Sequence, residues 1–489
     1  MNDYPLIDTL SHLLPLPLVI NYSEITRTMA PEDVENIRFA LQQHGHVHQV
    51  VLRAPSSRLR MWLEPMNKLF PRLGGLSLFS TTAEETNLML PKTLQAPDLG
   101  RLALHGISLP AGLSLLSSAI ALSTLSLTHI GASSYFPPGH LITHLQSLPH
   151  LEELSIGFAI PIPRPSDERE LLPPPTPPVT LPTLRRLTFR GVDVYLENLV
   201  AQISTPLLER LNLTLFFDLV FALANLTEFI YRTEGFECLV AQVIFNKDGA
   251  SIYAGSYDQS SVGPLSLHVS CEPLDWLIDS ATQVCSALGN VLLAVEELML
   301  DLDVDGMPSD WEETLDSMVW LELLLPFIGV KKLHIGSSLA RDVSRALKSD
   351  AGGLVSEFLP DLQELEVPIE AVHAKKLFSA FVQTRESMGR PVHLLAAPIQ
   401  HTKPHTLLVA PQTARPSFTN YHQWRDLGYP HQANRNQVMD LIPICQTLVY
   451  TQEQTCRSYD ELRRYRQITC ILSPCSTVVK VYLELLTMP

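Results

Sequence analysis

A short ladder of apolar residues recurs along most of this sequence. In its clearest copy, Leu184, Leu187 and Phe189 follow the pattern L-x-x-L-x-φ, in which φ is an apolar residue. The second half alternates between apolar and polar residues as a β-strand does, so Arg186 and Arg190 would point to the opposite face. One such strand cannot bury its apolar side alone. The ladder therefore requires neighbouring strands of the same kind.

The chain supplies these neighbours at irregular intervals. The ladders end at Leu52, Leu78, Leu104, Leu127, Ile156, Phe189, Leu213, Tyr231, Leu267, Leu300, Ile335 and Val367. Most steps span 23 to 36 residues, which leaves room for a strand and a return segment or helix. The step from Leu213 to Tyr231 spans 18 residues and is too short for a complete unit. The series predicts an α/β fold, an irregular leucine-rich-repeat solenoid (horseshoe) with a parallel concave sheet and helices on the convex side.

The distribution of the ladders divides the chain into three regions. Residues 1–46 would form an N-terminal cap with a helix at 31–43, and residues 47–398 the solenoid. The segment 160–182 is rich in proline and predicts an extended loop of polyproline character. We interpret it as a spacer between repeats, with an SH3-type ligand as the alternative. Residues 399–489 carry no ladder and are expected to form an appended segment of low order.

Composition narrows the class of protein. Apolar residues make up 46% of the chain and charged residues 18%, which is typical of a globular protein with a large core. The formal net charge of −16 disfavours general binding to nucleic acid or anionic membranes. No apolar run is long enough for a membrane span, and no signal peptide is evident. The seven scattered cysteines are typical of a reduced, cytoplasmic or nuclear protein.

Several motifs occur in order along residues 16–398. They are LPLVINY (16–22), PEDVE (31–35), AVEELML (294–300), VKKLHI (330–335), LPDLQEL (359–365) and GRPV (389–392). Together they resemble basidiomycete-fungal F-box/leucine-rich-repeat proteins, the F-box-like domain-containing family.

The resemblance implies a substrate-recognition solenoid of a ubiquitin-ligase receptor. Members of the family carry an N-terminal F-box, a helical module that binds the Skp adaptor of a cullin ligase. Residues 1–15, which precede the match, are too few for that module. A Skp-type partner is therefore expected only with an F-box upstream, and an orphan repeat scaffold without a ligase link is the alternative.

The segment 301–312 provides a second function class. Asp301, Asp303, Asp305 and Glu312 satisfy the calcium-loop pattern D-x-[DN]-x-[DN]-G-x5-E of an EF-hand. A calcium-responsive binding protein is thus an alternative to the interaction solenoid. However, an EF-hand needs an entering helix, whereas the preceding residues alternate as a strand. The other interpretation is an acidic loop that follows a repeat strand.

Other candidate sites have weaker patterns. His44, His46 and His48 would share one face of a strand, but no nearby carboxylate or cysteine completes a metal site. Cys445, Cys456, Cys470 and Cys475 lack a C-x2-C pair. No nucleophile elbow, P-loop, zinc-protease or dinucleotide-binding motif is present. We therefore expect no enzymatic activity and no cofactor.

The polar positions between ladder residues suggest where a partner binds. Arg186, Arg190, Arg210 and Arg232 would form a basic patch on the concave face of an otherwise acidic protein. Guanidinium groups bind carboxylates and phosphates in a bidentate manner. An acidic or phosphorylated protein or peptide is the expected partner. The competing interpretation is a mixed, solvated sheet face.

Overall fold

The structure is a computed structural model of the whole chain. It describes residues 17–24, 31–82, 88–110, 114–161, 178–216, 221–256, 263–270, 275–303, 317–348 and 359–396. All of them lie in Met1–Leu407, the first of two units into which the chain divides. Residues 399–489, expected to be an appended segment, lie outside the described residues, as does most of the proline-rich insertion.

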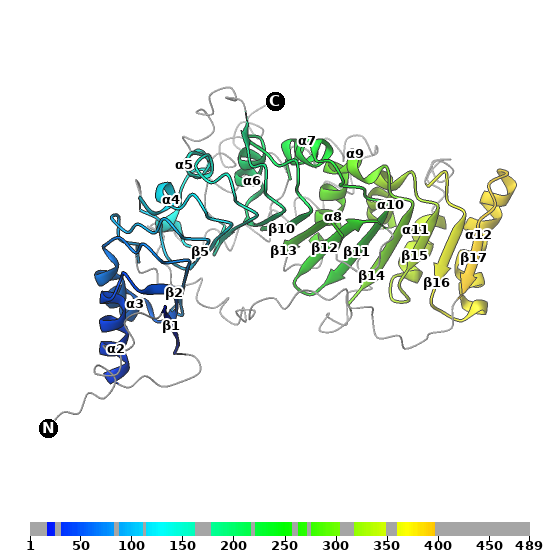
Figure 1. Cartoon of the computed structure of the whole chain (residues 1–489). Coiled ribbons are helices and arrows are strands. Elements are labelled where there is room, and N and C mark those ends of the chain that lie inside the picture. Colours follow the sequence, from blue (N-terminus) through cyan, green and yellow to red (C-terminus); the bar gives the residue numbers. More distant parts are fainter. Residues whose placement is uncertain are drawn as a thin grey trace, which may run out of the picture. The chain divides into compact units, whose positions relative to one another are not determined.

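One continuous sheet of fifteen strands organises the described residues (Figure 1). In spatial order its strands are β1 (Leu18–Ser23), β2 (Val47–Ala54), β3 (Gly75–Ser80), β4 (Arg101–His105), β5 (Thr124–Ile130), β6 (Glu153–Phe158), β8 (Arg186–Gly191), β10 (Arg210–Phe216), β13 (Leu265–Ser270), β12 (Gly249–Gly255), β11 (Val240–Asn246), β14 (Glu297–Leu302), β15 (Lys332–Ile335), β16 (Glu364–Val367) and β17 (His393–Ala396). A separate two-stranded sheet joins β7 (Val179–Thr180) to β9 (Ile203–Ser204).

Helices and short turns connect the strands. The α-helices are α2 (Pro31–Gln42), α3 (Ser56–Leu63), α4 (Ser114–Ser118), α5 (Pro138–Leu145), α6 (Asp193–Val200), α7 (Ala224–Arg232), α8 (Asp275–Ala287), α9 (Gly289–Leu292), α10 (Ser317–Leu324), α11 (Ala340–Lys348) and α12 (Ala371–Ser387). Glu64–Met66, Ala132–Ser134 and Leu325–Phe327 form 3-10 turns. No helix within the described ranges is long and apolar enough to cross a membrane.

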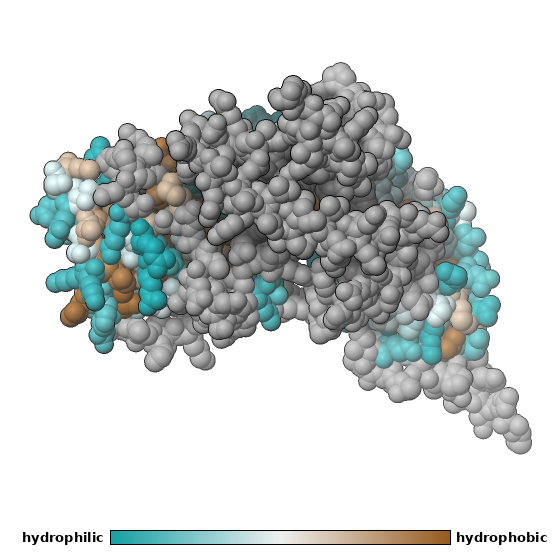
Figure 2. Space-filling model, turned by 180° about the vertical axis from the view of Figure 1, so that it is seen from behind, coloured by the Kyte–Doolittle hydropathy of each residue, from teal (hydrophilic) through white to brown (hydrophobic). Residues whose placement is uncertain are grey.

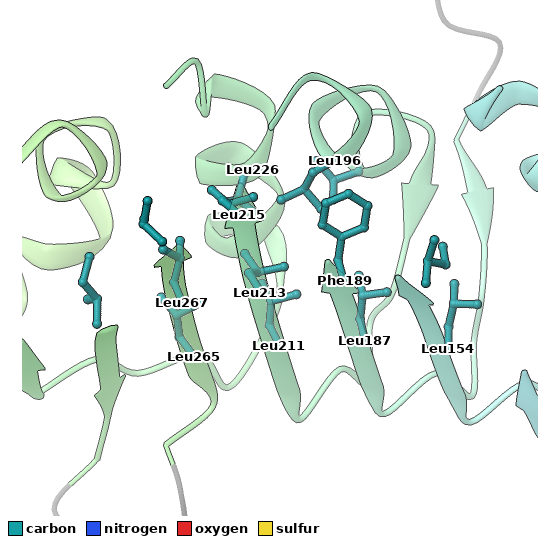
Figure 3. Packing of buried hydrophobic residues seen from close by; sticks show 14 of the residues in the cluster. Leu154, Leu187, Phe189, Leu196, Leu211, Leu213, Leu215, Leu226, Leu265 and Leu267 are labelled. Atoms are coloured by element: carbon teal, nitrogen blue, oxygen red, sulfur yellow. The ribbon is translucent and has the colours of Figure 1, made fainter. Parts of the chain in front are cut away.

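The ladder residues form the core because they all face the helices. Leu187 and Phe189 of β8 are fully buried, whereas Arg186, which precedes Leu187 in the same ladder, is exposed. Figure 3 shows Leu196 of α6 and Leu226 of α7 beside the ladder side chains. The same arrangement recurs in successive repeats, so each ladder packs against its neighbours and a shared layer of helices. The predicted leucine-rich-repeat solenoid is thereby confirmed.

The prediction of a ladder strand that ends at Tyr231 is wrong. Leu226 and Phe229 lie in helix α7 and are buried, while Tyr231 is 79% exposed. Spacings of three and four residues suit one face of a helix as well as the first half of a ladder. With no alternating second half to decide between them, the short step of the series was the signal that this copy is not a strand.

The sequence predicted a parallel sheet, but the observed sheet is not parallel throughout. Strands β11 and β12 form an antiparallel hairpin, and β12 is also antiparallel to β13. The hairpin reverses the spatial order of three strands, so that β13 lies beside β10 and β11 beside β14. Strands β11 and β12 occupy the interval between the ladder that ends at Leu213, in β10, and the ladder that ends at Leu267, in β13. Strands β1, β11, β12 and β17 do not correspond to any ladder in the sequence.

The ends of the repeat series are covered by polar surface. Figure 2 shows, at the two ends that carry α2 and α12, mainly hydrophilic residues with small apolar areas between them. Terminal repeats of a solenoid need such a surface because no further repeat covers them.

Candidate binding face

The candidate site is the face of the large sheet opposite the buried ladder, here called the polar face. Side chains of alternate strand residues form rows across the strands, because adjacent strands pair in register. The first row contains Arg101, Thr124, Glu153, Arg186 and Arg210, on β4, β5, β6, β8 and β10. Rows on this face follow one another every two residues, so the third row lies four residues beyond the first. It contains His105, Thr128, Gly157, Arg190 and Thr214.

Three of the four arginines proposed as a basic patch lie together on this face. Arg186 and Arg210 are register partners and are both exposed, and Arg190 lies on β8 beyond Arg186. The Arg186 guanidinium donates to Glu153 at 2.9 Å. Among the described residues, Arg210 has no ion-pair partner. The charge of Arg186 is therefore partly neutralised by a carboxylate, whereas that of Arg210 is not neutralised by any described residue.

The fourth arginine of the expected patch lies elsewhere. Arg232 occupies the last turn of α7 and pairs with Glu228 of the same helix at 3.4 Å. The expected position followed from assigning residues 226–231 to a strand. Because that segment is helical, Arg232 is not part of the polar face, and the basic patch consists of Arg186, Arg190 and Arg210.

A row of cationic and aromatic side chains accompanies this patch. It consists of Arg53, Phe79, His105, His129, Arg190 and Phe216, and we call it the cation–aromatic row. The Arg53 guanidinium carbon lies 4.8 Å from the centre of the Phe79 ring, and that of Arg190 lies 5.5 Å from Phe216. Between these pairs, the imidazoles of His105 and His129 stack at 4.9 Å with 20° between their planes.

Local backbone geometry brings the two histidines together. The pairing of β5 with β6 shifts between Leu127 and Ile130, which marks a β-bulge, and His129 has a φ of 56°. The bulge adds a residue to β5, so His129 stacks on His105 while Thr128 bonds the Nδ1 of the same ring at 3.0 Å. Simple alternation would send the side chains of Thr128 and His129 to opposite faces.

Burial and neighbouring cations keep both imidazoles neutral near pH 7. The pKa of His105 is lowered to about 4, chiefly by burial and further by His129 and Arg53. Burial, together with Arg190, lowers the pKa of His129. Burial also lowers the pKa of Arg190 itself, which remains a cation because guanidinium groups start from so high a value. The row is thus two cations that flank a neutral aromatic pair.

The polar face changes sign toward the C-terminal repeats. His334 on β15 contacts carboxylates on both sides, with Nε2 2.9 Å from Glu297 Oε1 and Nδ1 3.0 Å from Glu366 Oε2. Lys332 approaches the same Glu366 oxygen at 3.7 Å. These contacts tie β14, β15 and β16 together through their side chains. Glu297, His334 and Glu366 therefore share one face of the sheet.

Only part of the calcium-loop pattern lies within the described residues. Asp301 belongs to strand β14 and Asp303 follows it, while Asp305 and Glu312 lie outside the described part. Burial raises the pKa of Asp301, whose Oδ1 accepts the Leu302 N–H at 2.9 Å. The segment that enters the loop is a strand instead of the helix that an EF-hand requires. No group of metal-binding side chains is found within the described ranges.

The remaining sequence candidates are not brought together. His44 and His46 lie in the turn before β2, and only His48 belongs to the strand. The three histidines therefore do not line one strand face. Of the cysteines, Cys238 and Cys285 are buried and free, and burial raises the pKa of the Cys238 thiol to about 11. Cys445, Cys456, Cys470 and Cys475 lie outside the described residues.

Comparison with known proteins yields structural neighbours alone. No family model and no curated protein matches the sequence. The chain is similar to TLR13 in its complex with ssRNA13, at 13% identity and a TM-score of 0.25, over 73% of this chain and 46% of that one. It is also similar to a leucine-rich-repeat protein of Leptospira interrogans, at 14% identity and a TM-score of 0.24, over 76% of this chain and 97% of that one.

Proposed function

We propose that this chain is a protein-interaction scaffold that binds an acidic or phosphorylated peptide segment on the polar face of β8 and β10. The supporting observation is the side-by-side position of Arg186 and Arg210, with Arg190 beyond them on the same face. Guanidinium groups form paired, charge-assisted hydrogen bonds with carboxylates and phosphates. An extended peptide across these strands would meet several of them at once.

Reversal of charge at the patch tests this proposal. We expect the double variant Arg186→Glu, Arg210→Glu to lose its acidic partners in affinity purification of the full chain, because repulsion replaces the paired hydrogen bonds. Arg232→Glu is the matched control, since it reverses an exposed arginine on α7 that does not share the polar face. An unchanged set of partners in the double variant would refute the proposal.

A finer proposal concerns the pathway in which such a scaffold acts. The motifs that resemble fungal F-box/leucine-rich-repeat proteins support a role in substrate recognition for a ubiquitin ligase, in the cytoplasm or nucleus. Co-expression of the chain with a Skp-type adaptor tests the direct link, and genomic sequence upstream of Met1 tests whether an F-box is encoded there. If the adaptor does not bind and no F-box is encoded, the scaffold has no ligase link of this kind.

A further inference from the structure

We propose that this chain associates head to tail, with strand β17 of one copy pairing in parallel with strand β1 of the next copy. The contact would continue the sheet from one copy into the other, and helix α12 of the first copy would lie beside helix α2 of the second. It involves only the two edges of the sheet, so the polar face stays accessible to a partner.

The sheet ends in two strands that each pair on one side. Among the described strands, β1 pairs with β2 alone and β17 with β16 alone, and they lie at opposite ends of the sheet (Figure 1). An edge strand presents a row of backbone donors and acceptors with which another strand can pair. Lysine and proline commonly block such edges, and neither strand contains either residue.

The apolar core continues to both edges, where it is incompletely covered. Ile20 of β1 pairs with the second residue of the first ladder, and Leu394 of β17 pairs with the second residue of the last ladder. The two residues therefore hold equivalent positions. Leu18 and Leu394 pack against the core but are only partly buried. On the other face, Val19 is 57% exposed and Leu395 is 44% exposed. A further strand beyond each edge would cover these apolar side chains.

The direction of the backbone groups at the β17 edge follows from its pairing with β16. In a parallel sheet, the N–H and C=O of one residue point to the same side, and the side alternates along the strand. The His393 N–H donates to the Gln363 carbonyl oxygen of β16 at 2.8 Å. The N–H and C=O groups of Leu394 and Ala396 therefore point away from β16, toward the open edge.

The same argument applies to the β1 edge. The Glu24 N–H, just after β1, donates to the Arg53 carbonyl oxygen of β2 at 2.9 Å. Alternation then directs the N–H and C=O groups of Val19 and Asn21 away from β2. Both edges thus present outward backbone groups at every second residue.

The two sets of outward groups match when Leu394 lies beside Ile20 of the next copy, as the ladders require. The Leu394 N–H would donate to the Val19 carbonyl oxygen, and the Leu394 carbonyl oxygen would accept from the Asn21 N–H. The Ala396 N–H would donate to the Asn21 carbonyl oxygen. This pairing needs no bulge, and it places the core faces of both strands toward one shared layer of helices.

The helices that would meet across this contact carry opposite charges. Helix α2 follows β1 and α12 follows β16, so the two helices would run in the same direction with their first halves side by side. In these halves α12 exposes Lys375 and Lys376, whereas α2 exposes Glu35. Complementary charge directs the C-terminal end of one copy toward the N-terminal end of the next. It also offsets part of the repulsion between two chains of net charge −16.

Sedimentation velocity of the full chain over an about hundredfold range of concentration tests the association. We expect the average mass to rise with concentration beyond that of a dimer, because a head-to-tail contact between open edges does not close. Ala396→Pro and Asn21→Pro should each lower the association constant at least about tenfold, since proline has no N–H to donate. Ala396→Ser and Asn21→Ser are the matched controls and should associate as the unaltered protein does.

A mixture of the two proline variants gives the sharpest result. Proline is tolerated in an edge strand where the N–H faces outward, so both variants should fold. Ala396→Pro keeps an unaltered β1 edge and Asn21→Pro keeps an unaltered β17 edge. An equimolar mixture should therefore form a dimer and nothing larger, although each variant alone is a monomer. Formation of that dimer also shows that both variants are folded.

Reversal of charge tests the contact between the helices. The variant Lys375→Glu, Lys376→Glu should associate more weakly than the unaltered protein, and Glu35→Lys in the same chain should restore the association. A chain that is monomeric at every concentration refutes the proposal. So does association that stops at a dimer, or an Asn21→Pro variant that associates as the unaltered protein does, because either result would mean that one edge pairs with itself.

Discussion

At the scale of single residues, His129 shows how one irregular position changes a regular surface. Alternation along β5 predicts polar side chains at Thr124, Ser126 and Thr128, and all three are partly exposed. The bulge adds His129 to the same neighbourhood. A repeat strand without the bulge would present Thr128 alone. The stacked imidazole pair therefore depends on one residue in an uncommon backbone conformation.

The same pair makes a prediction about acid stability. Because burial lowers the pKa of His105 to about 4, the unfolded chain protonates near pH 6.5 before the folded protein does. Stability contributed by neutral His105 is therefore complete above about pH 6.5 and is lost as the pH falls toward 4. We expect a loss of about 1–2 kcal/mol, smaller than the full pKa difference implies because the ring is partly solvated.

Urea unfolding at pH 7.0 and 4.5 measures this loss. The variant His105→Gln, His129→Gln should lose less stability between the two pH values than the unaltered protein. His373→Gln is the control, because this histidine is exposed on α12, where its Nδ1 lies 3.2 Å from Oε2 of Glu370, the residue that precedes the helix. An equal loss of stability in the double variant and the unaltered protein would contradict the assignment.

At the scale of elements, the hairpin β11–β12 is the feature that separates two kinds of repeat. Its polar face carries Gln242 and Ile244 on β11 and Tyr253 on β12, none of them charged. Next to it, His268 of β13 bonds the Ser251 hydroxyl at 2.9 Å. The hairpin thus places uncharged strands between the basic patch and the acidic C-terminal repeats.

Gly249 is the residue on which the hairpin depends. Its φ of 154° is disfavoured for other residues, and a Cβ atom would lie 2.0 Å from the Val269 carbonyl oxygen of β13. We expect the backbone strain in Gly249→Ala to lower the free energy of unfolding by about 1–3 kcal/mol. The contact with the Val269 carbonyl oxygen adds to this loss. Hydrogen exchange should increase in β11, β12 and β13.

Gly139→Ala serves as the control for that substitution. Gly139 lies in α5, and a Cβ atom there would meet no atom within 4 Å. Alanine in a helix is favoured over glycine by about 0.5–1 kcal/mol, so stability should be unchanged or slightly higher. Equal effects of the two substitutions would show that the hairpin turn does not require glycine.

At the scale of the described repeats as a whole, the polar face is divided by charge. Strands β2 to β10 carry Arg53, Arg101, Arg186, Arg190 and Arg210 against one described carboxylate, Glu153. Strands β14 to β16 carry Glu297, Asp301, Glu364 and Glu366 against Lys332. The net charge of −16 for the chain conceals this division. An acidic ligand should therefore bind at one end of the face only.

Two single substitutions, one on each charged part of the polar face, test the division of charge. We expect Arg210→Glu to weaken hexaglutamate binding about fivefold, since a charge-assisted contact becomes a repulsion. Glu364→Lys should leave the affinity unchanged or raise it slightly. Calorimetry at low and at 1 M salt completes the test, because salt screens an electrostatic interaction of exposed groups. A loss of binding in Glu364→Lys would place the ligand across the whole face.

The apolar pattern of the sequence is sufficient to assign most residues of the core. Leu187, Phe189 and their counterparts are buried because alternation fixes the face of each strand, and recurrence requires strands to stack. It also placed Arg186 and Arg210 correctly on the polar face. It failed for Tyr231 because helical and ladder spacings coincide over a few residues.

Which polar side chains are neighbours follows from the way the strands pair in the folded protein. The position of Arg186 beside both Glu153 and Arg210 depends on the register between strands that lie 24 or more residues apart in the chain. The bulge at His129 and the reversed order of β11, β12 and β13 are likewise properties of pairing between strands. The repeated apolar pattern restricts the register to one that keeps every ladder buried, but the order of the strands and the position of a bulge arise from contacts between distant segments.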